Sequence, residues 1–98
     1  MAKEHAVIVT PDPAKALTYN VVARDGKSES SHRVSISAAD VARYSASGAE
    51  PSRCVEAALA FLLDREPKES ILPAFDIAAI RRYFPEFDEV FPAYLARA

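Results

Sequence analysis

The residues that could carry out covalent chemistry are few and scattered. Cys54 is the single cysteine, and the histidines are His5 and His32. A hydrolytic triad needs a nucleophile, a base and an orienting acid, and serines, His32 and aspartates supply these residue types. The sequence lacks a G-x-S-x-G elbow, a glycine-rich phosphate loop and an H-E-x-x-H pattern. We therefore expect no catalytic residue, no metal ligand, no cofactor and no enzyme activity.

Cys54 follows Arg53 near the start of a predicted helix. A helix N-terminus and a neighbouring cation both lower the pKa of a thiol, which would make it more reactive. No second cysteine or histidine lies at a metal-binding spacing from it. We interpret Cys54 as a small apolar core residue and His32 as a surface residue of a β-hairpin.

The composition is typical of one globular domain without electrostatic bias. Of the 98 residues, 50% are hydrophobic and 27% are charged, and the formal net charge is -2. A charge this small gives no overall attraction to nucleic acid or to anionic membranes. The single cysteine suits a reducing compartment, and the apolar run from Ala6 to Val9 is too short for a signal peptide or a membrane span. We expect a cytoplasmic protein without a membrane partner.

Alternating apolar residues predict a β-hairpin. Residues 17–24 alternate with the period of a half-buried strand, and residues 32–37 place Val34 and Ile36 on one face. The pair Asp25-Gly26 predicts a turn between the two strands.

Two registers of this hairpin are compatible with the pattern. A two-residue turn pairs Val21 with Ser30. A longer loop pairs Val21 with Val34 and therefore also sets Tyr19 opposite Ile36. We favour the longer loop because it places apolar side chains opposite each other.

The residues before the hairpin predict no stable element. Pro11 and Pro13 lack amide hydrogens and would interrupt a strand begun at residues 6–10. We treat residues 1–16 as a weakly structured N-terminal arm and residues 17–98 as a single α+β domain.

Two helices are expected after the hairpin. Ser37 and Asp40 form an approximate capping box for a helix over Ala38 to Ala46. Pro51 suits the first turn of the next helix, which ends before Pro67. Apolar residues at helical spacing make this second helix the expected centre of the core: Val55, Ala58, Leu59, Leu62 and Leu63.

The C-terminal part is rich in aromatic residues and punctuated by prolines. We expect residues 67–73 to form a turn or loop, Asp76 to cap a short helix over residues 77–84, and Pro85 to begin another turn or helix. Apolar residues recur here every three or four positions: Ile77, Ile80, Phe84, Phe87, Phe91 and Tyr94.

Most of these rings are expected to cover the hairpin, because an isolated hairpin is unstable in water. Phe91 and Tyr94, at the end of the stripe, are our candidates for binding a protein partner. Arg81 and Arg82 are expected on the solvent face. The predicted fold class is α+β, with an antiparallel β-hairpin packed against three to five short helices around a single core.

The segment FLLDREPKESILPAFDIAAIRRYFPEF resembles a family of small uncharacterised bacterial proteins. Members share a strand hairpin, a helix ending in F-L-L-x-R-E-P, and then S-I-L, F-D-[IL] and Y-F-P-E-[FY]. The resemblance spans Leu17 to Phe87. It implies the fold and a bacterial origin, and it brings no activity with it.

Residues 33–63, RVSIS-AADVARYSASGAE-PSRCVEAALAFLL, partly resemble the strand, helix, turn and helix of ribbon-helix-helix DNA-binding proteins and antitoxins. In that family, the strand enters the DNA major groove as half of a dimeric ribbon, and the second helix begins at a phosphate. The unit departs from the family in its longer interhelix segment and in lacking a basic excess. The resemblance implies the following nucleic-acid contacts: Arg33, Ser35, Ser37, Ser52 and Arg53.

The functional expectation has three forms. The first is a non-catalytic protein-interaction or regulatory module with an unknown protein partner, homodimeric through the hairpin edge or the aromatic tail. The alternative is a dimeric ribbon-helix-helix-like DNA-binding regulator or antitoxin. The third is a small-molecule binder with a pocket beneath the hairpin, for which the sequence specifies no ligand.

Overall fold

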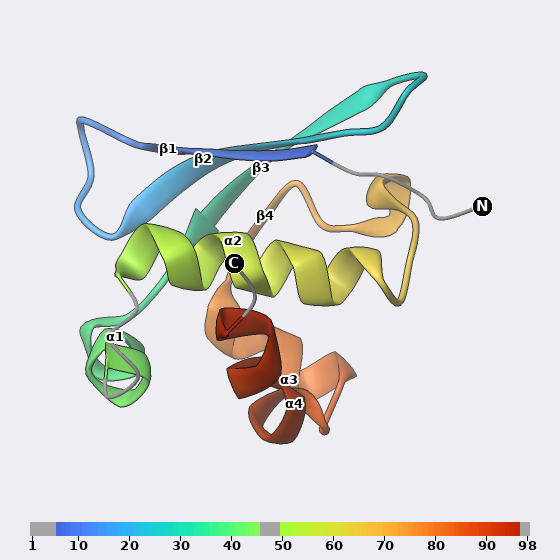
Figure 1. Cartoon of the computed structure of the whole chain (residues 1–98). Coiled ribbons are helices and arrows are strands. Elements are labelled where there is room, and N and C mark those ends of the chain that lie inside the picture. Colours follow the sequence, from blue (N-terminus) through green and yellow to red (C-terminus); the bar gives the residue numbers. More distant parts are fainter. Residues whose placement is uncertain (1–5, 46–49, 97–98) are drawn as a thin grey trace.

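A computed structural model describes residues 6–45 and 50–96 of the chain. Figure 1 shows a sheet that covers one side of helix α2, while α1, α3 and α4 lie on the other side of that helix. These elements share one hydrophobic core. The expected α+β class, with a β-hairpin packed against short helices, is confirmed.

The sheet contains four strands in the order β1-β2-β3-β4. Strands β1 (Ala6–Pro11), β2 (Thr18–Arg24) and β3 (Glu29–Ser35) are antiparallel neighbours. Strand β4 (Ala74–Asp76) runs parallel to β3 and forms the other edge. No alternation in the sequence marks β4, because it consists of only three residues.

The hairpin of β2 and β3 adopts a register between the two considered above. Val21 lies opposite His32, and Tyr19 lies opposite Val34. The favoured pairing of Val21 with Val34 is therefore wrong by two residues. A shift of two residues keeps every side chain on its face, so Val34 and Ile36 are buried, as the alternation predicts.

The turn explains this register. The Asp25 amide donates to the carbonyl of Ser28 at 3.0 Å. The Asp25 carboxylate accepts hydrogen bonds from the amides of Lys27 and Ser28, at 2.8 and 3.0 Å. These local bonds close the turn after Arg24, so that β3 begins at Glu29.

Residues 6–11 belong to the sheet rather than to a weakly structured arm. β1 pairs with β2 along its whole length, from Ala6 to Pro11. Pro11 is tolerated because it ends an edge strand, where a missing amide hydrogen breaks no interior ladder. β1 therefore extends the sheet by one strand beyond the predicted hairpin, next to β2.

The two predicted helices are present. Helix α1 spans Ala38–Ser45, and the Asp40 amide donates to the Ser37 hydroxyl at 3.1 Å, which confirms the N-terminal cap. The expected end of this helix at Ala46 lies outside the described residues. Helix α2 spans Pro51–Leu63 and is the centre of the core, as expected, with seven buried side chains: Cys54, Val55, Ala57, Ala58, Leu59, Phe61 and Leu62.

The remaining elements are short. They are η1 (Lys68–Ser70), η2 (Ile77–Ala79), α3 (Ile80–Tyr83) and α4 (Phe87–Leu95). The Asp76 carboxylate accepts from the Ala78 amide at 2.9 Å and so caps η2.

The aromatic residues of the tail form a cluster around Phe61 of α2. The Phe61 ring makes edge contacts with Phe84, Phe87 and Tyr94, with centroids 5.7, 4.9 and 5.6 Å away. Phe87 also stacks on Phe91 at 4.5 Å. These rings supply most of the apolar mass beneath α2 and hold α4 to it.

Candidate protein-binding site

Phe91 and Tyr94, expected to bind a partner, are part of the core. Phe91 is fully buried and Tyr94 is 8% exposed. The Tyr94 hydroxyl donates to the Asp64 carboxylate at 2.6 Å and accepts from Arg65 at 3.3 Å. A buried ring whose hydroxyl is already bonded offers no surface to a partner, so neither side chain is available to a partner.

Strand β3 does not have the free edge that a ribbon-helix-helix dimer needs. It is paired with β2 on one side and with β4 on the other. The Arg33 side chain forms an ion pair with Asp12, and the Ser35 hydroxyl donates to Asp76 at 2.7 Å. A two-stranded DNA-reading ribbon therefore could not form without removing a strand of this chain's own sheet.

Of the other DNA candidates, Ser37 and Arg53 have structural partners. Ser37 caps α1, and Ser52 is half-buried in the first turn of α2. The Arg53 guanidinium donates to the Tyr94 carbonyl at 2.9 Å and to the Glu56 carboxylate at 3.1 Å. Arg53 thus binds the C-terminal end of α4, where a cation is favourable.

His32 is buried, contrary to the expectation of a surface residue. Its Nδ1 lies 2.8 Å from the Leu72 carbonyl oxygen, and its Nε2 lies 2.7 Å from the Ser30 hydroxyl. Because a carbonyl only accepts, Nδ1 carries a proton, and in the neutral ring Nε2 accepts from Ser30. The pair resembles two members of a hydrolytic triad, but a neutral carbonyl stands where the orienting acid would be.

Cys54 is a core residue, as interpreted from the sequence. Its side chain is fully buried. Burial raises the pKa of the Cys54 thiol, and this effect exceeds the opposite influence of Arg53. The thiol is therefore protonated and poorly nucleophilic at neutral pH.

Within residues 6–45 and 50–96, no three histidine, cysteine or acidic side chains lie close enough together to hold a metal ion. Over the same residues, none of the helices is long and apolar enough to cross a membrane.

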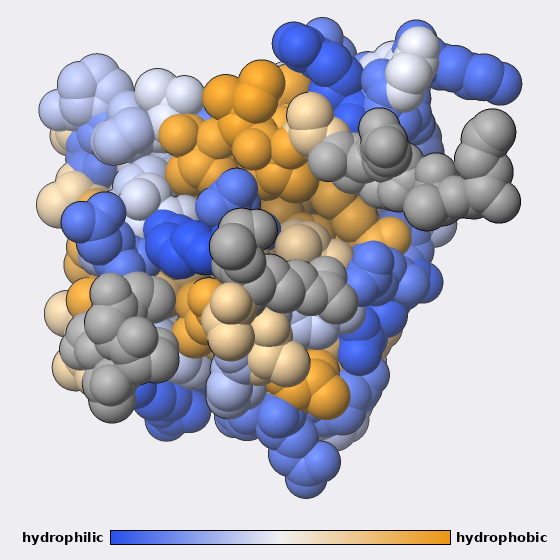
Figure 2. All heavy atoms as spheres, in the orientation of Figure 1, coloured by the Kyte–Doolittle hydropathy of each residue, from blue (hydrophilic) through white to orange (hydrophobic). Residues whose placement is uncertain are grey.

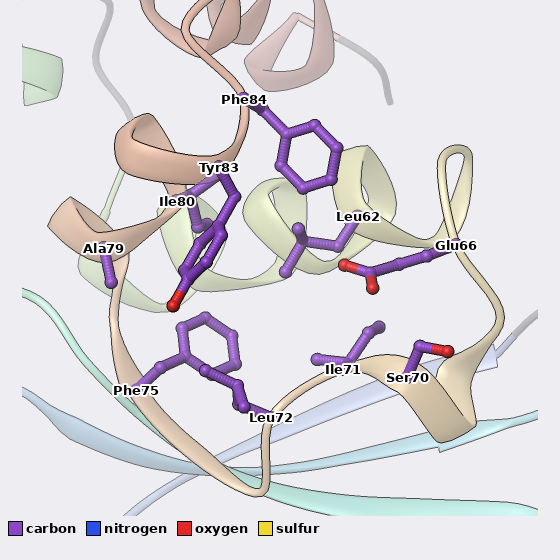
Figure 3. A pocket seen from close by; sticks show the side chains of 10 residues that line it. All are labelled: Leu62, Glu66, Ser70, Ile71, Leu72, Phe75, Ala79, Ile80, Tyr83 and Phe84. Atoms are coloured by element: carbon purple, nitrogen blue, oxygen red, sulfur yellow. The ribbon is translucent and has the colours of Figure 1, made fainter.

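An apolar pocket of about 240 Å³ opens between the end of α2 and the chain from η1 to α3. Figure 3 shows side chains from these segments converging on it. Leu62, Ile71 and Ile80 are buried and form its floor. Its other lining residues are Glu66, Ser70, Leu72, Phe75, Ala79, Tyr83 and Phe84.

Two of the three large hydrophobic side chains that are exposed in the described part of the chain flank this pocket. Leu72 is 49% exposed and Tyr83 is 68% exposed, while the third, Ile8, lies on β1. In Figure 3 the Tyr83 ring lies at one side of the pocket, and its hydroxyl end is directed toward the Phe75 ring. Exposed apolar side chains grouped around a hollow are typical of a binding surface.

The backbone at Leu72 is held by two hydrogen bonds from β3. The His32 ring donates to the Leu72 carbonyl, and the Arg33 amide donates to the Pro73 carbonyl at 2.8 Å. Pro73 keeps Leu72 out of helical geometry, so Ile71 turns inward and Leu72 outward. The rim of the pocket is therefore positioned by the sheet.

Tyr83 is placed at the rim by the end of α3. The Phe84 amide donates to the Ile80 carbonyl at 2.9 Å, which closes the last turn. Phe84 then packs against Phe61, so the preceding Tyr83 side chain points toward solvent.

Glu66 gives the pocket a negative charge. Figure 3 shows its carboxylate directed toward the pocket, and its side chain is half-buried. Within the described residues, no hydrogen bond or ion pair engages this carboxylate. The neighbouring cations are occupied, since Arg65 pairs with Glu86 at 3.2 Å and Lys68 with Asp25 at 2.8 Å.

The sequence patterns used above do not indicate this pocket. Pro67 and Pro73 do predict a turn or loop between them, but not that the segment returns to the sheet. The tertiary fold decides which member of two neighbouring apolar pairs is exposed. Leu72 is exposed beside the buried Ile71, and Tyr83 is exposed beside Phe84, which packs against the core.

No family model matches the chain, and the comparisons with curated proteins and solved structures found no match either.

Proposed function

We propose that this chain is a non-catalytic, cytoplasmic protein-interaction module that binds a short peptide segment of a protein partner in the pocket beside β4. The observation that carries the proposal is the placement of Leu72 and Tyr83 at the rim of an apolar pocket. Aromatic and aliphatic anchors around a hollow contribute most of the energy of typical interfaces.

The size of the pocket favours a single side chain as its occupant. Its volume of about 240 Å³ is below the range of about 300–1,000 Å³ that is usual for small-molecule sites. Its lining is mostly apolar, which suits a leucine, isoleucine or phenylalanine of the partner.

The negative charge of the pocket predicts a second feature of the partner. The Glu66 carboxylate lies among the lining residues, and no cation of residues 6–45 or 50–96 pairs with it. A lysine or arginine next to the apolar anchor would provide that cation and form a charge-assisted hydrogen bond. The proposed ligand is therefore an apolar residue followed or preceded by a basic one.

The test uses synthetic peptides as probes. Each peptide has a glycine-serine background with one central leucine or phenylalanine and an adjacent arginine, serine or glutamate. Fluorescence anisotropy should give the tightest binding with arginine. Tyr83→Ala and Leu72→Ala should each weaken this binding by about tenfold or more.

The matched control is Ile8→Ala, which removes the third exposed large hydrophobic side chain, on β1. Peptide affinity should not change in this variant. The proposal fails if no peptide binds, or if the binding is indifferent to both Leu72 and Tyr83.

The DNA-binding alternative has less support. β3 is paired on both sides within its own chain, and Arg53 is bonded to the end of α4. A nucleic-acid site also usually leaves a basic patch, whereas the pocket contains an acidic group.

A further inference from the structure

Strand β1 directs one row of backbone groups away from the sheet. The Asp12 amide donates to the Thr18 carbonyl at 2.9 Å, so the backbone of Asp12 faces the chain of β2. Thr10 and Ile8, two and four residues earlier in the same register, face β2 in the same way. Hydrogen-bonded positions alternate along an antiparallel pair. The backbone groups of the odd-numbered residues Val7 and Val9 therefore point outward, toward the edge.

This edge lacks the features that normally prevent strand pairing. Proteins protect edges with charged side chains, bulges or prolines within the strand. The sequence AVIVTP of β1 has no charged residue, and its pairing with β2 is continuous from Ala6 to Pro11. Pro11 lies at the end, so it leaves Val7 and Val9 accessible.

The surface beside the edge is partly polar and partly apolar. Val9 lies at a surface hollow that is also lined by Ser52, Arg53 and Glu56 of α2. Ala60 and Leu63 follow on the same stripe of this helix by helical spacing, and both are half-buried. Figure 2 shows hydrophobic side chains gathered along β1 and onto α2.

We propose that β1 pairs in antiparallel orientation with β1 of a second copy of the chain, so that two four-stranded sheets become one continuous sheet. The two-fold axis passes through Ile8. Val7 then exchanges both hydrogen bonds with Val9 of the second copy, and Ile8 faces Ile8 of the second copy on the uncovered side of the sheet. This proposal is independent of the peptide pocket and goes beyond the function proposed above.

A second copy is the occupant that fits best because the strand is self-complementary. The residues around Ile8 read valine, isoleucine, valine in both directions. A two-fold contact requires one patch to complement itself, and a strand without charge brings no like charges together. Stable interfaces bury at least about 1,000 Å², and Ala60 and Leu63 of α2 add apolar area to that of the strands.

The proposal also explains an exposed side chain. Ile8 is 45% exposed on the face of the sheet opposite α2. Side chains directly opposite each other at a non-hydrogen-bonded position approach most closely, so Ile8 would cover its own counterpart.

The test measures molar mass by light scattering during size exclusion, over a series of concentrations. Wild type should have twice the mass of one 10.7 kDa chain. Ile8→Lys and Ile8→Glu should each be monomeric because like charges would meet at the axis. An equimolar mixture of the two variants should recover the dimer, since lysine would then face glutamate.

Two further variants separate pairing from folding. Thr10→Lys is the matched control, with the same charge on the same face of the same strand but away from the axis, and it should remain dimeric. Val9→Pro removes an outward amide without touching the bonds to β2, so it should be a folded monomer by circular dichroism. Amide hydrogen exchange at Val7 and Val9 should be slow in the dimer and fast in Ile8→Lys.

A wild-type chain that is monomeric at the highest concentration measured would overturn the proposal. A dimer that persists in Ile8→Lys, Ile8→Glu and Val9→Pro would also overturn it, because the interface would then lie elsewhere.

Discussion

Lys68 and Asp25 form an ion pair between residues 43 positions apart, with the Lys68 ammonium donating to the Asp25 carboxylate at 2.8 Å. The Lys68 side chain is only 4% exposed. The pair connects η1 to the turn between β2 and β3, and η1 leads into the rim of the pocket. It therefore couples the hairpin to the proposed binding site.

This pair should make stability depend on pH. The hydrogen bond from Lys68, together with the amides of Lys27 and Ser28, holds the pKa of the Asp25 carboxyl well below its usual range. A carboxyl whose pKa is lower in the folded state stabilises the fold above its unfolded pKa of about 4, and this stabilisation is lost as the pH falls toward the folded pKa.

Urea denaturation should therefore show Asp25→Asn to be less stable than wild type at pH 7, with a difference that shrinks at pH 3. Glu29→Gln is the control, because Glu29 pairs with Arg24 on the surface and an exposed pair contributes little. Parallel pH profiles for wild type and Asp25→Asn would contradict this prediction.

Arg81 joins three helices rather than facing solvent. Its guanidinium donates to Asp88 at 2.8 Å, to Asp40 at 3.1 Å and to the Tyr44 hydroxyl. Asp40 is 5% exposed, so removing the cation leaves a buried charge without its ion-pair partner. Arg81→Met should cost about 3 kcal/mol in the free energy of unfolding.

Arg82, the neighbouring residue, is exposed as expected and serves as the matched control. Arg82→Met should change the free energy of unfolding by less than about 0.5 kcal/mol. Equal effects of the two substitutions in urea denaturation would show that the Arg81 contacts do not stabilise the fold.

The parts of the fold that follow from the sequence are those encoded locally. The Ser37 cap and the Asp76 cap each depend on an amide two or three residues away, and both are present. The alternation of the hairpin fixes which side chains face inward, because a shift of two residues changes the partners but not the face.

The parts that the sequence does not predict depend on distant contacts. β4 lies beside β3 because the His32 ring and the Arg33 amide donate to the carbonyls of Leu72 and Pro73, which are 40 residues further along the chain. No local sequence pattern predicts these contacts. The pocket depends on the same contacts, since they fix Leu72 at its rim. The exposure of Tyr83 depends in turn on where Phe84 packs.

Phe91 and Tyr83 should differ sharply in their effect on stability. Phe91 is fully buried against Tyr44 and Phe87, whereas Tyr83 is 68% exposed. Phe91→Ala should cost about 3–5 kcal/mol in the free energy of unfolding, because it leaves a cavity in the core. Tyr83→Ala should cost less than about 0.5 kcal/mol.

Thermal unfolding followed by circular dichroism measures both variants. If Phe91→Ala kept the wild-type melting temperature, the ring could not be a core residue. If Tyr83→Ala lowered that temperature as much as Phe91→Ala does, its effect on peptide binding could not be assigned to the binding surface.

Cys54 should react with thiol reagents only when the fold opens. The thiol is buried, and its raised pKa keeps it protonated at neutral pH. Labelling with a disulfide reagent should be slow in buffer and should accelerate in urea as unfolding begins. Fast labelling of the native protein would contradict the core assignment.

The pair Ser30 and His32 allows a direct test of the non-catalytic proposal. The Ser30 hydroxyl lies 2.7 Å from His32 Nε2, which is close enough for a base to activate a nucleophile. His32 is 5% exposed, and its other nitrogen is bound to the neutral Leu72 carbonyl, which cannot stabilise an imidazolium as a carboxylate does. A fluorophosphonate probe at neutral pH should therefore leave Ser30 unmodified, as measured by intact mass and peptide mapping. Labelling of Ser30 that disappeared in His32→Ala would instead identify a working nucleophile and base, and the non-catalytic part of the proposal would have to be withdrawn.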